Sequence, residues 1–563
     1  MKSTRLFCVM AVMLIACAFT SSAADFEVDG IFYNVIGTGE VEVAQYDSIK
    51  YAGEIIVPAT VLNDGITYQV KRIGNRAFYI CPDLTLIDIP EGVTSIGEYA
   101  FYNCTALQSI DFPNSLVSIE KRAFYSCKGL TGFYITRNVA NIHEEAFNHC
   151  IGVTSYLCNS MNAHYKSVNG VLYSKDLSTI VAYPPAAPAT SFDIPQGVTR
   201  IGGLAFFSNQ NLVNVNIPEN VTWIGYAAFG SSLKLASIDI PDGVTYMGKS
   251  AFINCADLTS VHLPAGIDSI FRDSFAWCPA LTEITIPRNV KFIDEFVFNE
   301  SGIKTITFEE GSCLNYIGNR TFEFCRSLES FDMPNSVTST GYQVFGYCNG
   351  LKSVHLSENL TTIESSMFLR CFKLQELDIP SSVTLVKSSA IDECTSLKKL
   401  KIGDKDATPG STMIESYVLR ECYSLDVLEL GANIDSIGRI CFLDVDSLKT
   451  VICWSLTPPR CNDSWQTFNP APNRLNATLY VPKESLEAYR TANEWKKFNT
   501  IVPIEDVGDV NGNGMIDIAD VTELIDQLLT GEFTNIPYSD IDLDGSITIS
   551  DVTELIDRLL SGN

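Results

Sequence analysis

The sequence predicts a repeat solenoid, mainly β with short turn or helical segments, followed by a small all-α domain. Three observations support this prediction. One pattern recurs with a period of 23 residues, its copies share the same apolar positions, and two near-identical segments 31 residues apart follow it. A fixed period of 20–50 residues is typical of stacked coils, because no single unit can bury its apolar face alone.

Each copy of the repeat has an anchor, which is the second residue of an Ala-Phe pair or its equivalent. Residues 89–113, IPEGVTSIGEYAFYNCTALQSIDFP, are a typical copy. Its L-x-x-I-x-I stretch predicts a short strand, which proline often closes, and a second extended piece and an A-F-x-x-C turn complete the coil. We expect inward-pointing anchors at Phe78, Phe101, Phe124, Phe147, Phe206, Phe229, Phe252, Phe275, Phe298, Phe322, Phe345, Phe368, Ile391, Leu419 and Phe442.

The repeat sets the expected domain order. Residues 25–70 alternate like strands without the repeat and predict a β cap, since an uncovered first coil would present an unpaired strand edge. Residues 71–450 form the solenoid, with a phase break at 151–200. The expected C-terminal cap covers 451–504, and the small α domain covers 505–563.

The N-terminus predicts export. Basic residues precede an apolar run over 6–19, and small residues up to Ala24 suit cleavage of a 1–24 signal peptide. The stretch 14–17 offers an alternative, because it resembles a bacterial lipobox in which Cys17 would carry a lipid anchor. No later stretch approaches the roughly 20 apolar residues of a membrane span, so we expect no integral membrane segment.

The cysteines predict a buried column rather than disulfides. Stacked side chains one strand apart point the same way, whereas a disulfide needs two Cβ atoms that face each other. We therefore interpret them as small buried apolar residues, while Cys453 and Cys461 could pair. Eleven lie three residues after an anchor: Cys81, Cys104, Cys127, Cys150, Cys255, Cys278, Cys325, Cys348, Cys371, Cys394 and Cys422.

The pattern over 71–450 resembles the BspA-type leucine-rich repeat of bacterial surface proteins. Residues 169–174 resemble the island that such arrays carry, and 477–482 with Tyr489, Trp495 and Phe498 resemble the closing unit. The resemblance implies a secreted or surface-exposed, non-catalytic binding array, often linked to adhesion to host proteins.

The outward positions of the main strands are the candidate binding face, because solenoids present extended faces for recognition. Tyr134 is the one aromatic residue among them, and His262 and His355 occupy equivalent positions. The alternative is that the column is only the solvated side of a sheet. Its members are Asp88, Asp111, Tyr134, Asn216, Asp239, His262, Thr285, Thr307, Asp332, His355, Asp378, Lys401 and Glu429.

Two loops at the C-terminus predict two calcium ions. Oxygen donors at loop positions 1, 3, 5, 9 and 12, with glycine at position 6, suit calcium, and position 7 supplies its backbone carbonyl. The predicted ligands of the first loop are Asp509, Asn511, Asn513, Met515, Asp517 and Asp520. Those of the second are Asp540, Asp542, Asp544, Ser546, Thr548 and Asp551.

Each loop leads into a near-identical helix, and position 12 is Asp rather than the Glu of an ordinary EF-hand. This duplication resembles a type I dockerin over about residues 505–563. The resemblance implies a cohesin-like partner, bound through loop positions 10 and 11 and the following helix. These positions are Ile518, Ala519, Ile549 and Ser550, where many dockerins carry a hydroxyl pair.

Several function classes are disfavoured. The net charge of −27 argues against nucleic acid, whose phosphates require Lys and Arg. The sequence contains no nucleophile elbow, phosphate loop or dinucleotide fingerprint, and we do not expect an enzyme. The leading hypothesis is an exported surface protein whose array binds a host or matrix protein or a polysaccharide. The alternative is an accessory or spacer component of a cohesin-organised polysaccharide-degrading complex.

Overall fold

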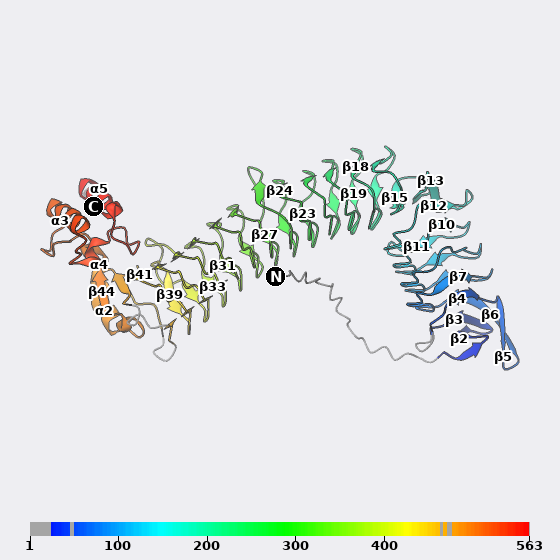
Figure 1. Ribbon diagram of the computed structural model, residues 1–563, viewed down its shortest axis with the longest axis horizontal. Coiled ribbons are helices and arrows are strands. Elements are labelled where there is room, and N and C mark those ends of the chain that lie inside the picture. The colour runs from blue at the N-terminus through cyan, green and yellow to red at the C-terminus, as the bar shows by residue number, and fades with distance from the viewer. Residues whose placement is uncertain (1–23, 46–49, 462–465, 470–475, 562–563) are drawn as a thin grey trace, which may run out of the picture. The chain divides into compact units, whose positions relative to one another are not determined.

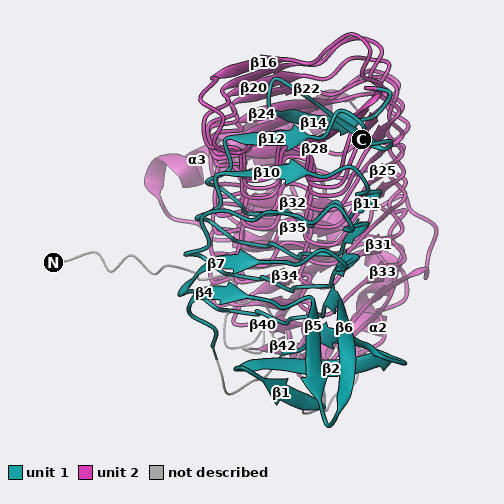
Figure 2. Cartoon of the chain, turned by 90° about the vertical axis from the view of Figure 1, so that its right-hand side faces the viewer, with its two compact units in different colours: residues 1–176 teal, residues 177–563 magenta. Residues whose placement is uncertain are grey.

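The computed structural model describes residues 24–45, 50–461, 466–469 and 476–561. It divides into two units, residues 1–176 and 177–563, which we describe separately (Figure 2). Cys17 and all but the last residue of the predicted signal peptide fall within residues 1–23, outside the described residues. No helix in the described part of the chain has both the length and the apolar character that a membrane span needs.

Unit 1 begins with antiparallel strands. β1 pairs with β2, β2 with β3, and β5 with β6. β6 pairs in parallel with both β3 and β8, so the parallel stack of second strands begins at β3. The bounds of these strands are β1 (Phe26–Val28), β2 (Ile31–Gly37), β3 (Glu40–Val43), β5 (Thr60–Asn63) and β6 (Ile66–Ile73).

The coils of unit 1 contribute main strands to two parallel two-stranded sheets, β4 with β7 and β10 with β12, and second strands to the mixed eight-stranded sheet. An antiparallel hairpin follows them. The main strands are β4 (Gly53–Ile56), β7 (Leu84–Asp88), β10 (Gly132–Ile135) and β12 (Ser155–Cys158). The second strands are β8 (Ser95–Ile96), β9 (Ser118–Ile119) and β11 (Asn141–Ile142). The hairpin is β13 (Tyr165–Val168) and β14 (Val171–Ser174), within the predicted phase break.

Unit 2 stacks its main strands in parallel and in a register that follows the repeat. Ser237 faces Ser260, and Asp239 faces His262. The main strands are β16 (Ser191–Asp193), β18 (Asn214–Asn216), β20 (Ser237–Asp239), β22 (Ser260–His262), β24 (Glu283–Ile286), β26 (Thr305–Phe308), β28 (Ser330–Asp332), β30 (Ser353–His355), β32 (Glu376–Ile379), β35 (Lys399–Ile402), β38 (Val427–Leu430), β41 (Thr450–Cys453), β43 (Thr478–Val481) and β44 (Thr500–Pro503).

The second strands of unit 2 are short, and a third set forms where the anchors become Ile391 and Leu419. The second set is β15 (Thr179–Ala182), β17 (Arg200–Ile201), β19 (Trp223–Ile224), β21 (Tyr246–Met247), β23 (Ser269–Ile270), β25 (Phe292–Ile293), β27 (Tyr316–Ile317), β29 (Ser339–Thr340), β31 (Thr362–Ile363), β33 (Leu385–Val386), β36 (Thr412–Ile414) and β39 (Ile434–Ile437). The third set is β34 (Ile391–Asp392), β37 (Leu419–Arg420), β40 (Phe442–Leu443) and β42 (Phe468–Asn469).

The anchors form the predicted interior ladder. From Phe206 to Phe368 the rings of consecutive coils stack with centroids 5.0–5.7 Å apart. Phe78, Phe101 and Phe124 stack in the same way in unit 1, at 5.1 Å. These rings are almost fully buried. The ladder and the parallel strands confirm the predicted solenoid.

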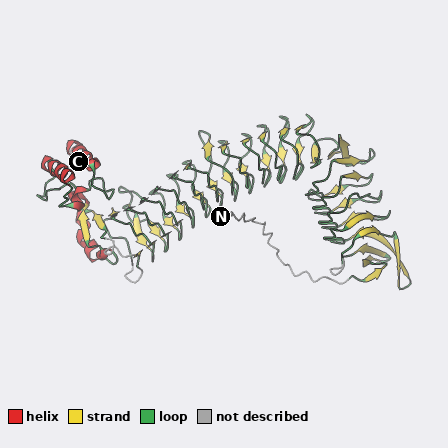
Figure 3. Ribbon diagram, in the orientation of Figure 1, coloured by secondary structure: helices red, strands yellow, loops and turns green. Residues whose placement is uncertain are grey.

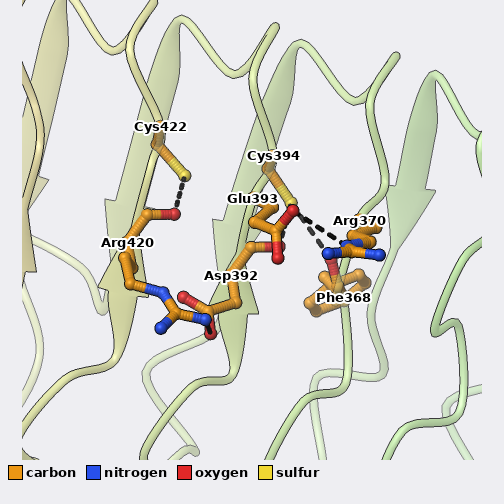
Figure 4. A network of polar contacts seen from close by, with 7 residues as sticks. All are labelled: Phe368, Arg370, Asp392, Glu393, Cys394, Arg420 and Cys422. Carbon is orange, nitrogen blue, oxygen red and sulfur yellow. Dashed lines mark hydrogen bonds and ion pairs between the residues drawn. The ribbon is translucent and has the colours of Figure 1, made fainter.

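The cysteines form the predicted buried column, and they also have a polar role. Their thiols are free, and Cys278 Sγ donates a hydrogen bond to the Phe252 carbonyl at 3.1 Å. Figure 4 shows the equivalent bond from Cys394 to Phe368, also 3.1 Å long. Burial raises the pKa of Cys278 to about 12, so this thiol stays protonated as a donor. Cys453 and Cys461, which the sequence allowed to pair, are both free thiols.

The recurring glycine after the second strand is required for close packing between coils. A Cβ atom at Gly202 would lie 2.6 Å from the Ile180 carbonyl oxygen, and one at Gly225 would lie 2.5 Å from the Gly203 nitrogen. Neither glycine has a positive φ. The space left by the missing side chain, and not a left-handed backbone, explains the glycine here.

The described helices all lie towards the C-terminus of unit 2 (Figure 3). They are η1 (Lys483–Ser485), α2 (Leu486–Thr491), η2 (Trp495–Lys497), η3 (Ile504–Asp506), α3 (Ile518–Thr530), α4 (Ile536–Ser539) and α5 (Ile549–Ser561). We call residues 505–563 the tail, and the stacked strands of unit 2 the array. Figure 1 shows α4 next to β44, with α3 and α5 beyond it, and apolar side chains of the tail and of the last main strands form one buried cluster.

Candidate calcium site and docking surface

Each predicted calcium loop leads directly into a helix of 13 residues, α3 or α5. Asp517 caps α3, because its side chain accepts a hydrogen bond from the Ala519 nitrogen at 2.7 Å. Asp520 reaches back to the Asp517 nitrogen at 2.8 Å and completes a capping box. The helix ends at Gly531, whose φ of 72° is left-handed.

The first loop folds around its own carboxylate and amide oxygens. Asp509 accepts hydrogen bonds from the backbone nitrogens of Asn513, at 2.9 Å, and Gly514, at 2.8 Å. Asp520 accepts one from the Asn511 nitrogen at 3.0 Å. Gly514 has a φ of +85°, which lets the chain turn back between the donors.

The second loop repeats this arrangement. Asp540 accepts from the Gly545 nitrogen at 3.0 Å, and Asp551 accepts from the Asp542 nitrogen at 3.2 Å. Gly545 has a φ of +84°. Carboxylate oxygens of Asp540, Asp542 and Asp544 all lie within 4.8 Å of one another. The predicted ligands at positions 1, 3 and 5 are therefore brought together.

The chemistry of the second loop fits a calcium ion. Asp540 is 4% exposed, and among the described residues its Oδ1 has no hydrogen-bond partner. Burial, and then the charge of Asp551, raise the pKa of Asp540 to about 7. A hard cation would neutralise these carboxylates and satisfy the buried oxygen.

The remaining predicted ligands lie on the same two loops. Met515, Ser546 and Thr548 are exposed, and Asp517 is half-buried. Exposed side chains at Met515 and Ser546 are compatible with a ligand role for the backbone carbonyl at position 7. The ligand role of all twelve residues remains a prediction.

The predicted docking residues lie at the first turn of each helix. Ile518 and Ile549 are 71% and 72% exposed, and Ala519 and Ser550 are exposed beside them. The structure adds two further exposed pairs at equivalent positions, which are Ile525 with Ile556 and Leu529 with Leu560. Spacings of seven and eleven residues place each set on one helix face, a signal that was available in the sequence.

The three predicted contact residues of the outward column are exposed on separate strands, one in unit 1 and two in unit 2. Tyr134 lies on β10 in unit 1 and accepts a hydrogen bond from the Asn159 side-chain amide at 3.2 Å. In unit 2, His262 lies on β22 and His355 on β30. Their Nδ1 atoms are 3.9 and 3.4 Å from carboxylate oxygens of Asp239 and Asp332.

A polar hollow of about 410 Å³ lies over β18, β20 and β22. Its lining includes Asn216, Asp239, Asp242 and His262. Carboxylate, amide and imidazole groups in one open hollow suit a polar ligand, because each group can form hydrogen bonds with it. The structure thus brings His262 together with column residues of the two preceding coils, whereas His355 lies four strands further along the array.

Sequence reasoning missed the last part of the outward column. Beyond Glu429 the register continues through Ile452, Tyr480 and Val502, which are 5%, 2% and 2% exposed. These apolar residues belong to the cluster that the tail covers. Counting on along the strand register would have found them.

The chain matches the family model described as BspA type Leucine rich repeat region (6 copies). The matched stretches are residues 71–184, 182–301, 268–398 and 370–457. No curated protein sequence matches the chain.

Three solved structures illustrate the similarity. A leucine rich cell surface protein from Faecalibacterium prausnitzii is 24% identical over 72% of this chain and 93% of its own, with a TM-score of 0.39. A leucine-rich repeat protein from Bacteroides ovatus is 22% identical over 85% of this chain and 99% of its own, with a TM-score of 0.40. The pneumococcal vaccine antigen PcpA is 15% identical over 86% and 99%, with a TM-score of 0.34.

Residues 507–560 match the Dockerin type I domain. This match supports calcium binding by the tail, because domains of this type bind calcium, and it implies a cohesin partner. The repeat match covers well over half of the chain. The chain therefore belongs to the BspA type leucine-rich repeat family and carries a dockerin type I domain.

Proposed function

We propose that this is an exported, non-catalytic surface protein whose array binds a macromolecule and whose tail binds two calcium ions and docks to a cohesin module. The observation that carries the proposal is the combination of the two matches with exposed, duplicated residues on α3 and α5. Polar side chains exposed on successive parallel strands form an extended face, which suits recognition.

In the docking role, Ile518 and Ile549 contact the partner with the helix faces that follow them. Their side chains are about seven-tenths exposed, although the same helices bury Val521 and Val552 against the array cluster. Calcium, when bound, supplies the positive charge that holds the loop carboxylates together. The residues of the loops then fix the first turns of the helices and orient the docking residues.

A binding assay with the full chain and immobilised type I cohesin modules tests the docking role. We expect binding in calcium, and a loss of at least about 100-fold in the double variant Ile518→Asp, Ile549→Asp, because each charge would be buried at the interface. Ile536→Asp is the matched control, since Ile536 is 57% exposed on α4 outside the two helix faces. Failure to bind any cohesin, or equal binding by the double variant, contradicts the docking role.

In the array role, the outward column recognises a host or matrix protein or a polysaccharide. Repeated weak contacts along an extended face add to a useful avidity. The hollow at His262 lies on this face. An unbiased screen of matrix proteins and polysaccharides with the full chain tests the role, with His262→Ala as the site variant and Phe292→Ser, on the second strands, as the control.

The outcome of both assays separates adhesion from the alternative role. A spacer in a cohesin-organised complex predicts cohesin binding without any ligand for the array. An adhesin predicts an array ligand whose binding falls in His262→Ala. A chain that binds neither a cohesin nor any screened macromolecule contradicts both.

A further inference from the structure

We propose that the calcium site of the second loop, residues 540–551, stabilises the packing of the tail on the array, so that calcium also stabilises the last coils of the array. The inference rests on the calcium binding proposed above. An independent domain on a linker would unfold alone when calcium is removed. The buried cluster shared by tail and array leads to a different expectation.

The outward column of the array changes character where the tail begins to cover it. Strand pairing places Asp378, Lys401, Glu429, Ile452, Tyr480 and Val502 in one row across consecutive main strands. Asp378 is exposed, Lys401 and Glu429 are half-buried, and the last three are at most 5% exposed. Outward apolar side chains of this kind would lie in solvent without the tail. The last main strands of the array therefore form the apolar surface on which the tail packs.

The tail contributes the other half of this cluster, including residues of the second loop itself. Ile541 is fully buried and Leu543 is 9% exposed, and both belong to the cluster that contains Ile452 and Tyr480. They alternate with Asp540, Asp542 and Asp544. Five consecutive residues thus hold both the predicted metal ligands and the apolar contact, so a change in one must move the other.

Leu543 gives the second loop a second apolar contact, whereas the first loop contributes Val510 alone from the equivalent positions. The Leu543 φ of 57° lies in the left-handed region, which is unfavourable for a leucine. The equivalent position of the first loop is Gly512, whose φ is 72° and which tolerates that conformation. A strained leucine at this position is consistent with a side chain retained for its packing.

The two loops also differ in what surrounds their central glycines. A Cβ atom at Gly545 would lie 3.5 Å from Thr450 Oγ1 and 3.7 Å from Lys449 Cδ, next to β41. A Cβ atom at Gly514 would meet no described atom within 4 Å. The Tyr480 hydroxyl donates to the Pro537 carbonyl at 3.1 Å, immediately before the second loop. The second loop therefore lies against β41 at its central glycine, whereas the first loop, which adds Val510 to the same buried cluster, is open at Gly514.

Removal of calcium should weaken the packing through the buried carboxylate. Without a cation, Asp540 keeps an unpartnered buried oxygen beside two further carboxylates. Such burial is unfavourable, and the loop relieves it by opening. Opening would withdraw Ile541 and Leu543 from the cluster and expose Ile452, Tyr480 and Val502.

Hydrogen exchange of the full chain, in calcium and in excess chelator, tests the inference. At free calcium 100 times the dissociation constant, linkage predicts about 100-fold more protection than in chelator. We expect this change in β43 and β44 as well as in the tail, and no change in β20 and β22. Loss confined to residues 505–561 would overturn the inference. Absence of calcium binding in calorimetry would instead defeat the calcium assignment itself.

Matched variants compare the contributions of the two loops, and of buried and exposed positions of the tail, to the calcium response of β43 and β44. Leu543→Gly should still bind calcium, because Gly512 holds the same place in the first loop, but β43 and β44 should exchange in calcium as they do in chelator. Leu560→Ala, at an 81% exposed position outside the buried cluster, should leave the hydrogen exchange of β43 and β44 as in the parent. Asp544→Ala should abolish the calcium response of β43 and β44, whereas Asn513→Ala should leave most of it. Equal effects of the last two variants would contradict a special role of the second loop.

Discussion

The inward and outward positions of the same coils follow different rules. Inside unit 2, Phe206 to Phe368 repeat one residue in nearly one geometry, and the thiols repeat one hydrogen bond. Outside, neighbouring positions of one row carry Asp239, His262 and Thr285, which share neither charge nor size. The comparison teaches that the coil requires its interior residues, whereas its exterior is free to vary for recognition.

Substitutions of interior residues should cause the largest losses of stability. Phe252→Ala removes a fully buried ring that stacks between Phe229 and Phe275, at 5.2 and 5.6 Å. We expect a loss of about 3–5 kcal/mol in the free energy of unfolding, because a cavity replaces the ring. Guanidinium unfolding followed by circular dichroism measures it. A loss below about 1 kcal/mol would mean that the ladder does not hold the coils together.

The buried carboxyl group of Asp392 should make stability depend on pH. Asp392 is 3% exposed, and its Oδ2 accepts a hydrogen bond from Arg420 at 3.0 Å (Figure 4). Burial raises its pKa from 3.8 to about 6 despite the arginine. Protonation therefore favours the folded state. The stability from this group is full below pH 3.8 and is lost as the pH rises through about 6.

Asp392→Asn removes that dependence. Between pH 4 and pH 8 the variant should gain up to about 3 kcal/mol relative to the parent, the equivalent of the gap between the two pKa values. Unfolding midpoints of both proteins at the two pH values provide the measurement. Arg370→Gln, which removes a partner of Glu393 at the surface, is the control and should show little change with pH. A variant that loses stability at pH 8 would contradict the sign.

The sequence predicted the parts of the molecule that repeat. The Phe and Cys columns follow from spacing alone, because in-phase residues stack once the strands pair in parallel. The apolar surface under the tail was not predicted, since the predicted column ended at Glu429. Ile452 follows at the regular spacing of 23 residues, but the 28 residues from there to Tyr480 break the period. Whether an outward residue is buried depends on a segment distant in sequence, which no local pattern reports.

The same limit applies to the thiols. Their burial was predicted from position, but their hydrogen bonds depend on the carbonyl of the preceding coil. Ser232 stands in the same column and donates to the Phe206 carbonyl at 2.9 Å. The column thus selects small donors, and not only small apolar residues.

Substitutions of Cys278 test whether the thiols act as hydrogen-bond donors or only as small apolar residues. Cys278→Ala leaves the Phe252 carbonyl without its donor and should cost about 1–3 kcal/mol, whereas Cys278→Ser should cost less because serine donates the same bond. Guanidinium unfolding under reducing conditions compares the two variants. If alanine is tolerated better than serine, the thiols act as apolar filling alone.

The exterior should give the smallest change in stability and the clearest change in binding. The His262 side chain is 59% exposed, and Asp239 beside it is 90% exposed. His262→Ala should therefore change the free energy of unfolding by no more than about 0.5 kcal/mol, because exposed pairs contribute little. Any ligand identified for the array should nevertheless bind this variant more weakly, since the imidazole lines the hollow over β18, β20 and β22. If the variant loses stability and keeps its ligand, the outward column supports the coil in the same way as the interior, and the distinction between the two faces fails.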